Sequence, residues 1–119
     1  MDKDKEILVG CNKLLYIVTH DTLRCKMAIE LDLRDEEADM YYELIGVFKS
    51  KPWAFFEADH GKNIIIYNYK TKKTVKKILL NNEVYKFEIS FDEKYFGIID
   101  INKEVIIWFS DTFLVAFAS

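Results

Sequence analysis

The chain has 119 residues, enough for one domain that buries roughly two-thirds of the surface exposed by its unfolded chain. Hydrophobic residues make up 50% and aromatic residues 15%, a composition that excludes intrinsic disorder and supplies a packed core. The formal net charge of −3 is too small to indicate a nucleic-acid or membrane partner.

The N-terminal residues do not resemble a targeting segment. Residues 2–6 are all charged, and the apolar run after them, Ile7–Val9, is shorter than the core of a signal peptide. No run approaches the ~18 apolar residues of a membrane-spanning helix. Cys11 and Cys25 have no metal-ligand spacing, so we expect free thiols in a reducing compartment, with the cytoplasm or nucleus as location.

Short apolar runs in the first thirty residues predict β-strands. The runs 6–10 and 14–19 are separated by a polar pair, which is the spacing of a β-hairpin. From Leu23 to Leu31 apolar and polar residues alternate, a pattern that predicts a half-buried strand.

Residues 32–39 lack strand character because acidic side chains crowd them. The segment is either a solvated connection or the start of a helix that Asp32 or Asp35 caps and that extends over about 32–46. With the helix, the chain is a compact α+β protein. In either case the acidic side chains of this segment can neutralise the lysines described below or bind a basic partner.

From residue 42 onward, apolar runs alternate with polar turns, and Pro52 and Gly61 mark two of these turns. β-Branched and aromatic residues fill the runs, each of which is too short for an ordinary helix. The pattern therefore predicts antiparallel β meanders. The expected strands are 42–48, 53–58, 63–69, 74–80, 84–91, 95–100, 105–109 and 113–118.

Part of this pattern repeats with a period of 41 residues. Residues 55–71 and 96–112 align without a gap, and Tyr67 and Trp108 end matching apolar runs. We expect these two aromatic side chains to be buried at equivalent places.

A third copy lies near the N-terminus, where Tyr16 occupies the place that matches Tyr67 and the opening strand is missing. The repeat divides a single β-rich unit into segments at about 6–31, 42–80 and 84–118.

Four strands at this period resemble a blade of a WD-repeat β-propeller. The resemblance rests on Phe91–Tyr95 and Val105–Trp108, since that family places a phenylalanine and a polar turn before the second strand and a tryptophan at the end of the third. Tyr67-Asn68 stands where the family has Trp-Asp. The resemblance implies an all-β fold of about two and three-quarter blades, formed by antiparallel four-stranded meanders.

The sequence departs from the family at two kinds of position. Asn81-Asn82 and Asp39-Met40 replace the Gly-His dipeptide, and Phe109 replaces the aspartate after the tryptophan, so the usual His-to-Asp hydrogen-bond network is expected to be lost. A closed propeller typically has four to eight blades. We therefore expect a fragment of a longer protein, or self-association or partner binding through open sheet faces.

The sequence contains no recognisable catalytic, cofactor-binding or metal-binding motif. His20 and His60 fall in predicted turns, where surface histidines are common. Asp59 and Asp100 occupy equivalent hairpin positions in the repeat and are interpreted as turn formers. We expect no enzyme activity, no cofactor and no metal.

Lysines of the predicted hairpin Lys62–Lys77 form the candidate interaction surface. Lysines beside aromatic rings can bind phosphates and stack bases, but they also protect a sheet edge from pairing. The negative net charge and the absence of a nucleic-acid-binding motif favour a solvated hairpin. The candidate residues are Tyr69, Lys70, Lys72, Lys73, Lys76 and Lys77.

Three functions remain open at this point. The resemblance implies a non-catalytic protein-interaction scaffold, or a fragment of a larger WD-repeat-like propeller. The helix over 32–46 would instead indicate a small acidic α+β protein that binds and inhibits a partner. Nucleic-acid binding through the lysine hairpin is the weaker alternative.

Overall fold

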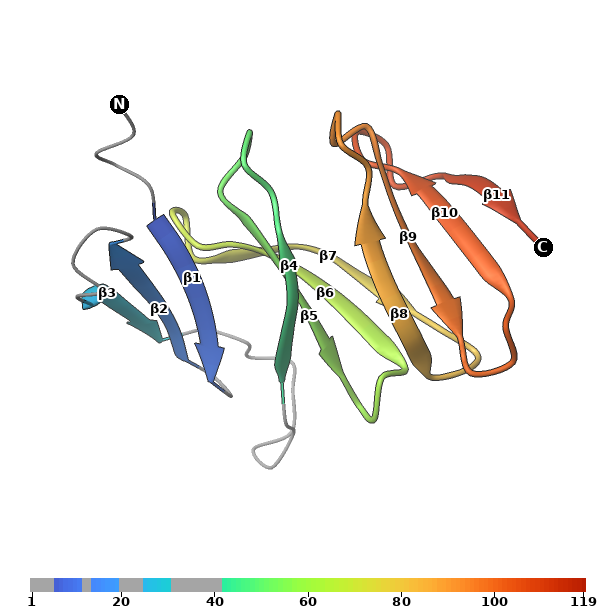
Figure 1. Cartoon of the computed structure of the whole chain (residues 1–119), viewed down its shortest axis with the longest axis horizontal. Coiled ribbons are helices and arrows are strands. Elements are labelled where there is room, and N and C mark those ends of the chain that lie inside the picture. The colour runs from blue at the N-terminus through green and yellow to red at the C-terminus, as the bar shows by residue number, and fades with distance from the viewer. Residues whose placement is uncertain (1–5, 12–13, 20–24, 31–41) are drawn as a thin grey trace.

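The computed structural model describes residues 6–11, 14–19, 25–30 and 42–119, and these residues form antiparallel β-strands in three sheets (Figure 1). Sheet 1 has the strand order β1-β2-β3, sheet 2 the order β4-β5-β6-β7, and sheet 3 the order β8-β9-β10-β11. The strands are β1 (Glu6–Cys11), β2 (Leu14–Thr19), β3 (Cys25–Glu30), β4 (Glu43–Val47), β5 (Trp53–Ala58), β6 (Asn63–Asn68), β7 (Lys73–Leu79), β8 (Val84–Ile89), β9 (Tyr95–Asp100), β10 (Val105–Phe109) and β11 (Val115–Ala118).

The predicted all-β fold of antiparallel four-stranded meanders is confirmed, and the described residues contain no helix. The alternative of a helix over 32–46 is wrong for its C-terminal part, because residues 43–47 form β4. Residues 32–41 lie outside the described residues. Residues 43–47 form a strand rather than a helix because Leu44 and Val47 pack on the apolar cluster around Phe56 and the backbone of β4 pairs with β5.

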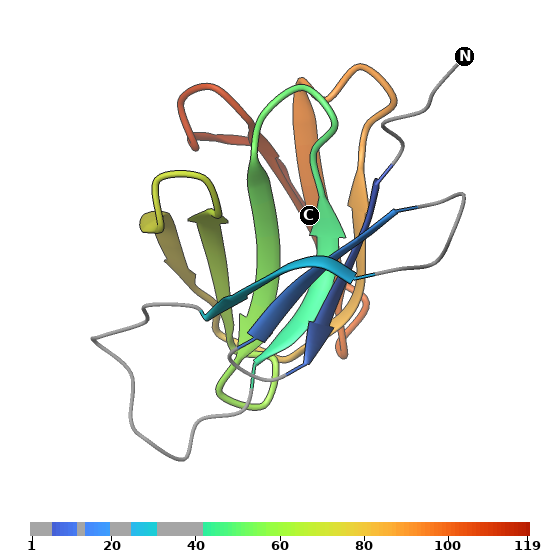
Figure 2. The ribbon, with the colours of Figure 1, turned by 90° about the vertical axis from the view of Figure 1, so that its left-hand side faces the viewer.

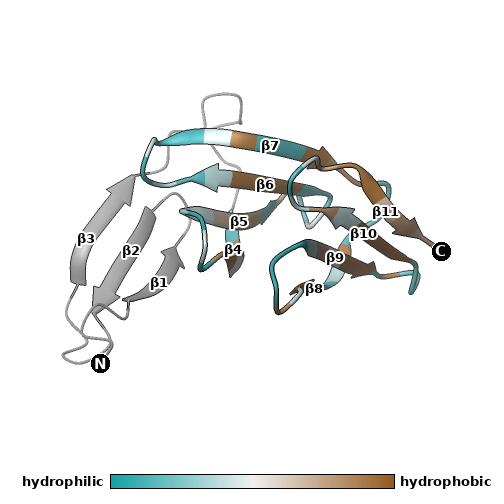
Figure 3. Cartoon of the chain, turned by 90° about the horizontal axis from the view of Figure 1, so that it is seen from above, coloured by the Kyte–Doolittle hydropathy of each residue, from teal (hydrophilic) through white to brown (hydrophobic). Residues whose placement is uncertain are grey.

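The first strand of each sheet lies at the inner side of the assembly. β1 lies beside β4, and β4 lies beside β8. β7 and β11 form the outer edges of sheets 2 and 3 (Figure 3). β1 therefore has the position of an opening strand. The expected match of Tyr16 with Tyr67 is wrong, because Tyr16 lies in the second strand of its sheet and Tyr67 lies in the third.

One apolar cluster covers the face of sheet 2 that is turned toward sheet 1. Tyr67 lies in it and is completely buried, as expected from the repeat. Its buried members come from β5, β6 and the residue before β4. They are Tyr42, Ala54, Phe56, Ala58, Ile65 and Tyr67.

A second apolar cluster joins the opposite face of sheet 2 to sheet 3. Phe55 of β5 lies 5.1 Å from Phe96 of β9 and 5.2 Å from Phe87 of β8, measured between ring centroids. Trp108 stacks on Phe96 at 5.4 Å and is 4% exposed. Trp108 and Tyr67 thus occupy the same strand of successive sheets and both face the preceding sheet, which confirms their predicted equivalence.

The strand register shows that the 41-residue repeat is broken by one residue. Tyr67 lies opposite Ala54 in sheet 2, whereas Trp108 lies opposite Phe96 in sheet 3. The second strands are therefore offset by 42 residues, and the alignment of 55–71 with 96–112 without a gap is wrong in its first strand. The difference arises in the turn that joins the second and third strands, which is one residue shorter in sheet 3.

Candidate interaction surfaces

The two aspartates expected to be equivalent turn formers have different roles. Asp59 is exposed in the turn after β5, in a left-handed conformation with φ of 53°. Asp100 is buried at the end of β9, where Oδ1 accepts hydrogen bonds from the backbone N–H groups of Asn102 (2.9 Å) and Glu104 (3.0 Å). Asp100 therefore fixes its turn as expected, but its counterpart in sheet 2 is Ala58, so the predicted equivalence is wrong.

The lysine surface predicted from the sequence is divided by the structure. Lys70 and Lys72 lie in the turn between β6 and β7, and Lys73 begins β7, the outer edge strand of sheet 2. Lys62 lies in the turn after β5, at the other end of the strands. The hairpin expected over Lys62–Lys77 thus does not present one continuous row of charge.

The remaining residues of the candidate surface follow the edge strand. Lys76 and Lys77 lie opposite Ile66 and Ile65, so their side chains point to opposite faces of the sheet. Tyr69 is half-buried and packs against the cluster that contains Tyr67. These contacts leave the ring of Tyr69 poorly placed to stack on a base.

The outward face of sheet 3, on the side away from sheet 2, carries an open apolar hollow of about 310 Å³. Gly97 and Ile99 of β9 and Val105 and Ile107 of β10 line its floor. This face is therefore an extended, partly exposed apolar surface rather than a solvated polar one.

The border of the hollow combines aromatic and charged side chains. Tyr95 and Phe109 lie against each other at 5.4 Å between ring centroids, and their side chains are 39% and 37% exposed. On the innermost strand, Lys86 Nζ lies 3.6 Å from Glu88 Oε1. The hollow thus has an aromatic border on one side and an ion pair on the other.

The hollow exists because Gly97 occupies the position that Phe55 occupies in sheet 2. The ring of Phe55 fills the junction between sheets 2 and 3, whereas Gly97 has no side chain and leaves the equivalent space on sheet 3 empty. A Cβ atom at Gly97 would lie 2.8 Å from the carbonyl oxygen of Ile106, so the backbone there accepts glycine only. Whatever covers this face must supply the bulk that Phe55 supplies at the preceding junction.

A carboxylate clasp, which sequence reasoning missed, connects sheets 2 and 3. Glu93, in the turn after β8, accepts hydrogen bonds from the backbone N–H of Lys49 (2.6 Å) and from the N–H (3.0 Å) and hydroxyl (2.5 Å) of Ser50. Burial raises the pKa of Glu93, but the hydrogen bonds from Ser50 and Lys49 outweigh it and hold the pKa below its usual value. The clasp aligns the turns of successive sheets.

The two outer edge strands differ in how they are protected. β7 carries exposed lysines, whereas β11 is uncharged and hydrophobic along most of its length (Figure 3). Val115 and Phe117 of β11 are exposed, as is Leu114 just before it. Lysine side chains oppose pairing with another strand, so of these two edges β11 is the more open to it.

Comparison with solved structures identifies the fold, although no protein-family model and no curated protein matches the sequence. Kluyveromyces lactis Hsv2 is 12% identical with a TM-score of 0.72, and the match covers 97% of this chain and 33% of that one. Saccharomyces cerevisiae Sqt1 is 19% identical with a TM-score of 0.66, over 98% of this chain and 31% of that one. The three sheets resemble blades of a β-propeller. The structure also resembles Kuenenia stuttgartiensis hydrazine synthase (9% identity, TM-score 0.69, 98% of this chain and 32% of that one), so this chain spans about a third of each matched structure.

A hydrogen bond joins the turn before β8 to the end of β9, although the Gly-His dipeptide is missing. Asn82, which stands where a Gly-His dipeptide was expected, donates a hydrogen bond from Nδ2 to Oδ2 of Asp100 at 3.3 Å. The expected loss of the histidine is real, but an amide replaces the imidazole, so the turn before β8 is still joined to the turn after β9.

In residues 42–119 and the described strands before them, no group of three or more His, Cys, Asp or Glu side chains is arranged to hold a metal. The same part of the chain contains no helix that is long and apolar enough to cross a membrane.

Proposed function

We propose that this chain is a non-catalytic protein-interaction module, a WD-repeat-like segment of a β-propeller that binds through the outward face of sheet 3. The apolar hollow over Gly97 carries the proposal, because the corresponding face of sheet 2 is the one that sheet 3 covers. An exposed apolar face of this kind is typical of a binding surface.

The partner that fits the hollow is another β-sheet, either from further blades of a longer protein or from a binding protein. At the junction of sheets 2 and 3, Phe87 packs so closely on Gly46 that a Cβ atom there would lie 2.7 Å from the phenylalanine ring. A bulky apolar side chain over Gly97 would make the equivalent contact on sheet 3. Packing of this kind excludes water from both faces, and each fully buried large apolar side chain contributes ~1.5–3 kcal/mol.

Light scattering at micromolar concentration tests the proposal on the 119-residue chain. We expect self-association, because the open face removes apolar area from water when a second molecule covers it. Ile99→Asp and Ile107→Asp place a charge on this face and should shift the protein toward monomer. Leu79→Asp is the matched control, since Leu79 is 73% exposed at the end of β7, away from the hollow.

The outcomes separate the alternatives. A wild-type protein that is a clean monomer and melts cooperatively would show that the face needs no partner, and the proposal would then be wrong. Association that Leu79→Asp weakens as much as Ile99→Asp would place the interface elsewhere. Circular dichroism of each variant confirms that a loss of association does not reflect unfolding.

The other two functions have less support. A small acidic α+β inhibitor requires a fold that the strands of residues 42–119 do not form. Nucleic-acid binding through the lysine hairpin requires stacking rings beside the lysines, and Tyr69 packs into the core instead.

A further inference from the structure

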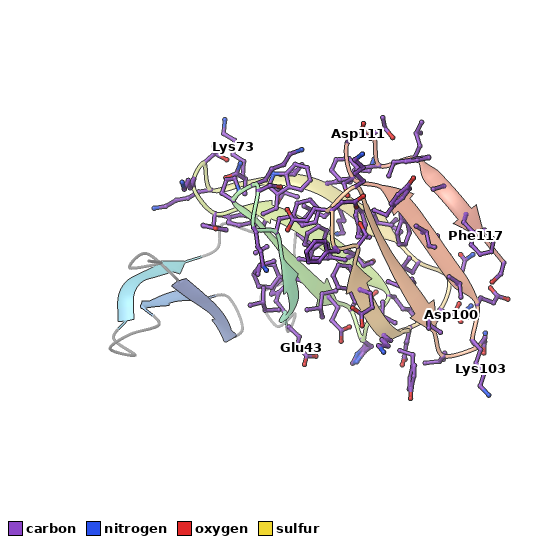
Figure 4. All side chains as sticks on the ribbon, turned by 45° about the horizontal axis from the view of Figure 1, so that its top comes forward. Glu43, Lys73, Asp100, Lys103, Asp111 and Phe117 are labelled. Atoms are coloured by element: carbon purple, nitrogen blue, oxygen red, sulfur yellow. The ribbon has the colours of Figure 1, made fainter. Side chains whose placement is uncertain are left out.

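The two ends of the strands carry opposite charge. The turns after β4, β6, β8 and β10, together with the first residue of β7, form one end, here called the basic end (Figures 2 and 4). It has six lysines against three carboxylates. The lysines are Lys49, Lys51, Lys70, Lys72, Lys73 and Lys94, and the carboxylates are Asp92, Glu93 and Asp111.

The opposite end, here called the acidic end, comprises the turns after β5, β7 and β9 and the strand residues beside them. Its charged residues are Glu43, Glu57, Asp59, Glu83, Asp100 and Glu104, against Lys62 and Lys103. Figure 4 shows Glu43, Asp100 and Lys103 on this side and Lys73 and Asp111 on the other. The small net charge of the whole chain hides this separation.

The turns of the basic end form one continuous surface. The backbone N–H of Tyr69 donates to the carbonyl oxygen of Pro52 at 3.0 Å, which joins the turn after β6 to the turn after β4. The clasp from Glu93 to Lys49 and Ser50 joins the turn after β4 to the turn after β8. Lysines from three turns, contributed by both sheets, are therefore held on a rigid common base.

Two of the three carboxylates at this end are engaged by the turns themselves. Glu93 accepts the three hydrogen bonds of the clasp, and Oδ1 of Asp92 accepts from the Ser90 hydroxyl (2.7 Å) and the Lys94 backbone N–H (3.0 Å). Hydrogen bonds from Lys94 and Ser90 lower the pKa of Asp92. Both carboxylates stay charged, and the six lysines still exceed the three carboxylates by three positive charges at this end.

An aromatic side chain stands among these charges. Phe91 lies at the tip of the turn after β8, next to the clasp, and its relative exposure is 105%. A phenylalanine in this position contributes nothing to the core. Exposed aromatic side chains on rigid turns are typical anchors of protein interfaces.

We propose that the basic end binds an acidic, extended segment of a partner protein, whose carboxylates pair with the lysines while one apolar side chain packs on Phe91. A protein segment fits better than nucleic acid for two reasons. Residues 42–119 contain no arginine for bidentate phosphate contacts, and this end offers one fully exposed ring rather than a series for stacking bases. The proposal adds a second surface to the proposed module and does not require the hollow of sheet 3.

Fluorescence anisotropy with a labelled Glu-rich peptide that carries one central leucine tests this surface at low and physiological salt. The triple variant Lys70→Gln, Lys73→Gln, Lys94→Gln should weaken binding about tenfold, as the sum of three exposed ion pairs. The matched control is Lys62→Gln, Lys76→Gln, Lys103→Gln, which removes the same charge elsewhere and should change the affinity less than about twofold. Equal losses in both triple variants, or no binding of the peptide at low salt, would overturn the proposal.

A double-mutant cycle isolates the contact with Phe91. Phe91→Ala should weaken the leucine peptide about fivefold and leave a peptide with serine in place of leucine unchanged. A loss that is equal for both peptides would remove Phe91 from the site. A single-stranded RNA of similar charge is the remaining probe, and tighter binding of this RNA, lost in the same triple variant, would assign the surface to nucleic acid instead. Ile99→Asp should bind the peptide like wild type, so failure of this inference is distinguishable from failure of the hollow as a binding face.

Discussion

Replacing Glu57 by glutamine should flatten the dependence of stability on pH. Glu57 in β5 lies directly opposite Glu43 in β4, so two carboxyl groups face each other across neighbouring strands. Burial, a hydrogen bond with Glu43 and the charges of Glu43 and Glu83 together raise the pKa of Glu57 to about 7. The folded protein thus holds a proton that the same residue loses in the unfolded chain.

The sign of the effect follows from this difference. The unfolded side chain titrates near 4.5 and the folded one near 7, so the free energy of unfolding falls as pH rises between these values and is constant above them. Without solvent screening, a pKa shift of this size would change the free energy of unfolding by ~3 kcal/mol. Glu57 remains partly exposed, and solvent screening reduces the expected change to about 1 kcal/mol.

Urea denaturation at a series of pH values from about 5 to about 8 measures this change. Glu57→Gln should match wild type at the acid end and exceed its stability by about 1 kcal/mol at the alkaline end. Glu43→Gln should also flatten the curve, because it removes the main partner of Glu57. Glu104→Gln, an exposed change at the same end of the molecule, should keep the wild-type slope. Parallel curves for Glu57→Gln and wild type would refute the shared-proton argument.

Three further changes probe the core and the surface, each by urea denaturation. Trp108→Ala should cost ~3–5 kcal/mol or prevent folding, since the indole is buried against Phe96. An unchanged denaturation midpoint would remove Trp108 from the core. The combined change of Lys70, Lys72 and Lys73 to Gln should alter stability little, because exposed charges contribute ~0–1 kcal/mol each, and a cooperative loss of several kcal/mol would contradict a solvated turn. Ser110→Ala should raise stability by ~1 kcal/mol, because its buried hydroxyl has no hydrogen-bond partner among the described residues, and destabilisation would reveal one.

The strands and their order could be predicted from the sequence because their pattern is local. Alternation and short apolar runs placed strands at 53–58 and 105–109, and β5 and β10 have these bounds. The burial of Tyr67 and Trp108 followed from their equivalent places in the repeat. These features depend on residues close in the chain, which a sequence pattern records directly.

The register of the second strands could not be predicted, because it depends on how a turn closes rather than on a residue count. Ala54 pairs with Tyr67, 13 residues later, whereas Phe96 pairs with Trp108, 12 residues later, so the turn of sheet 3 is one residue shorter. A shift of one residue moves every side chain of a strand to the other face. The clasp at Glu93 was missed for a related reason, since its partners come from a turn more than forty residues earlier.

The exchange of large and small residues between sheets indicates what can cover the hollow. In sheet 2 a small residue, Gly46, pairs with a large one, Phe55, and the gap over Gly46 receives Phe87 of sheet 3. In sheet 3 the corresponding cross-strand pair is Glu88 with Gly97, so the gap has moved from the innermost strand to the next one outward. A sheet that docked as sheet 3 does on sheet 2 would press its phenylalanine onto the charged side chain of Glu88. The covering sheet must therefore carry its bulky side chain one strand further out, and this mismatch disfavours a repeat of the existing junction while admitting a differently built partner.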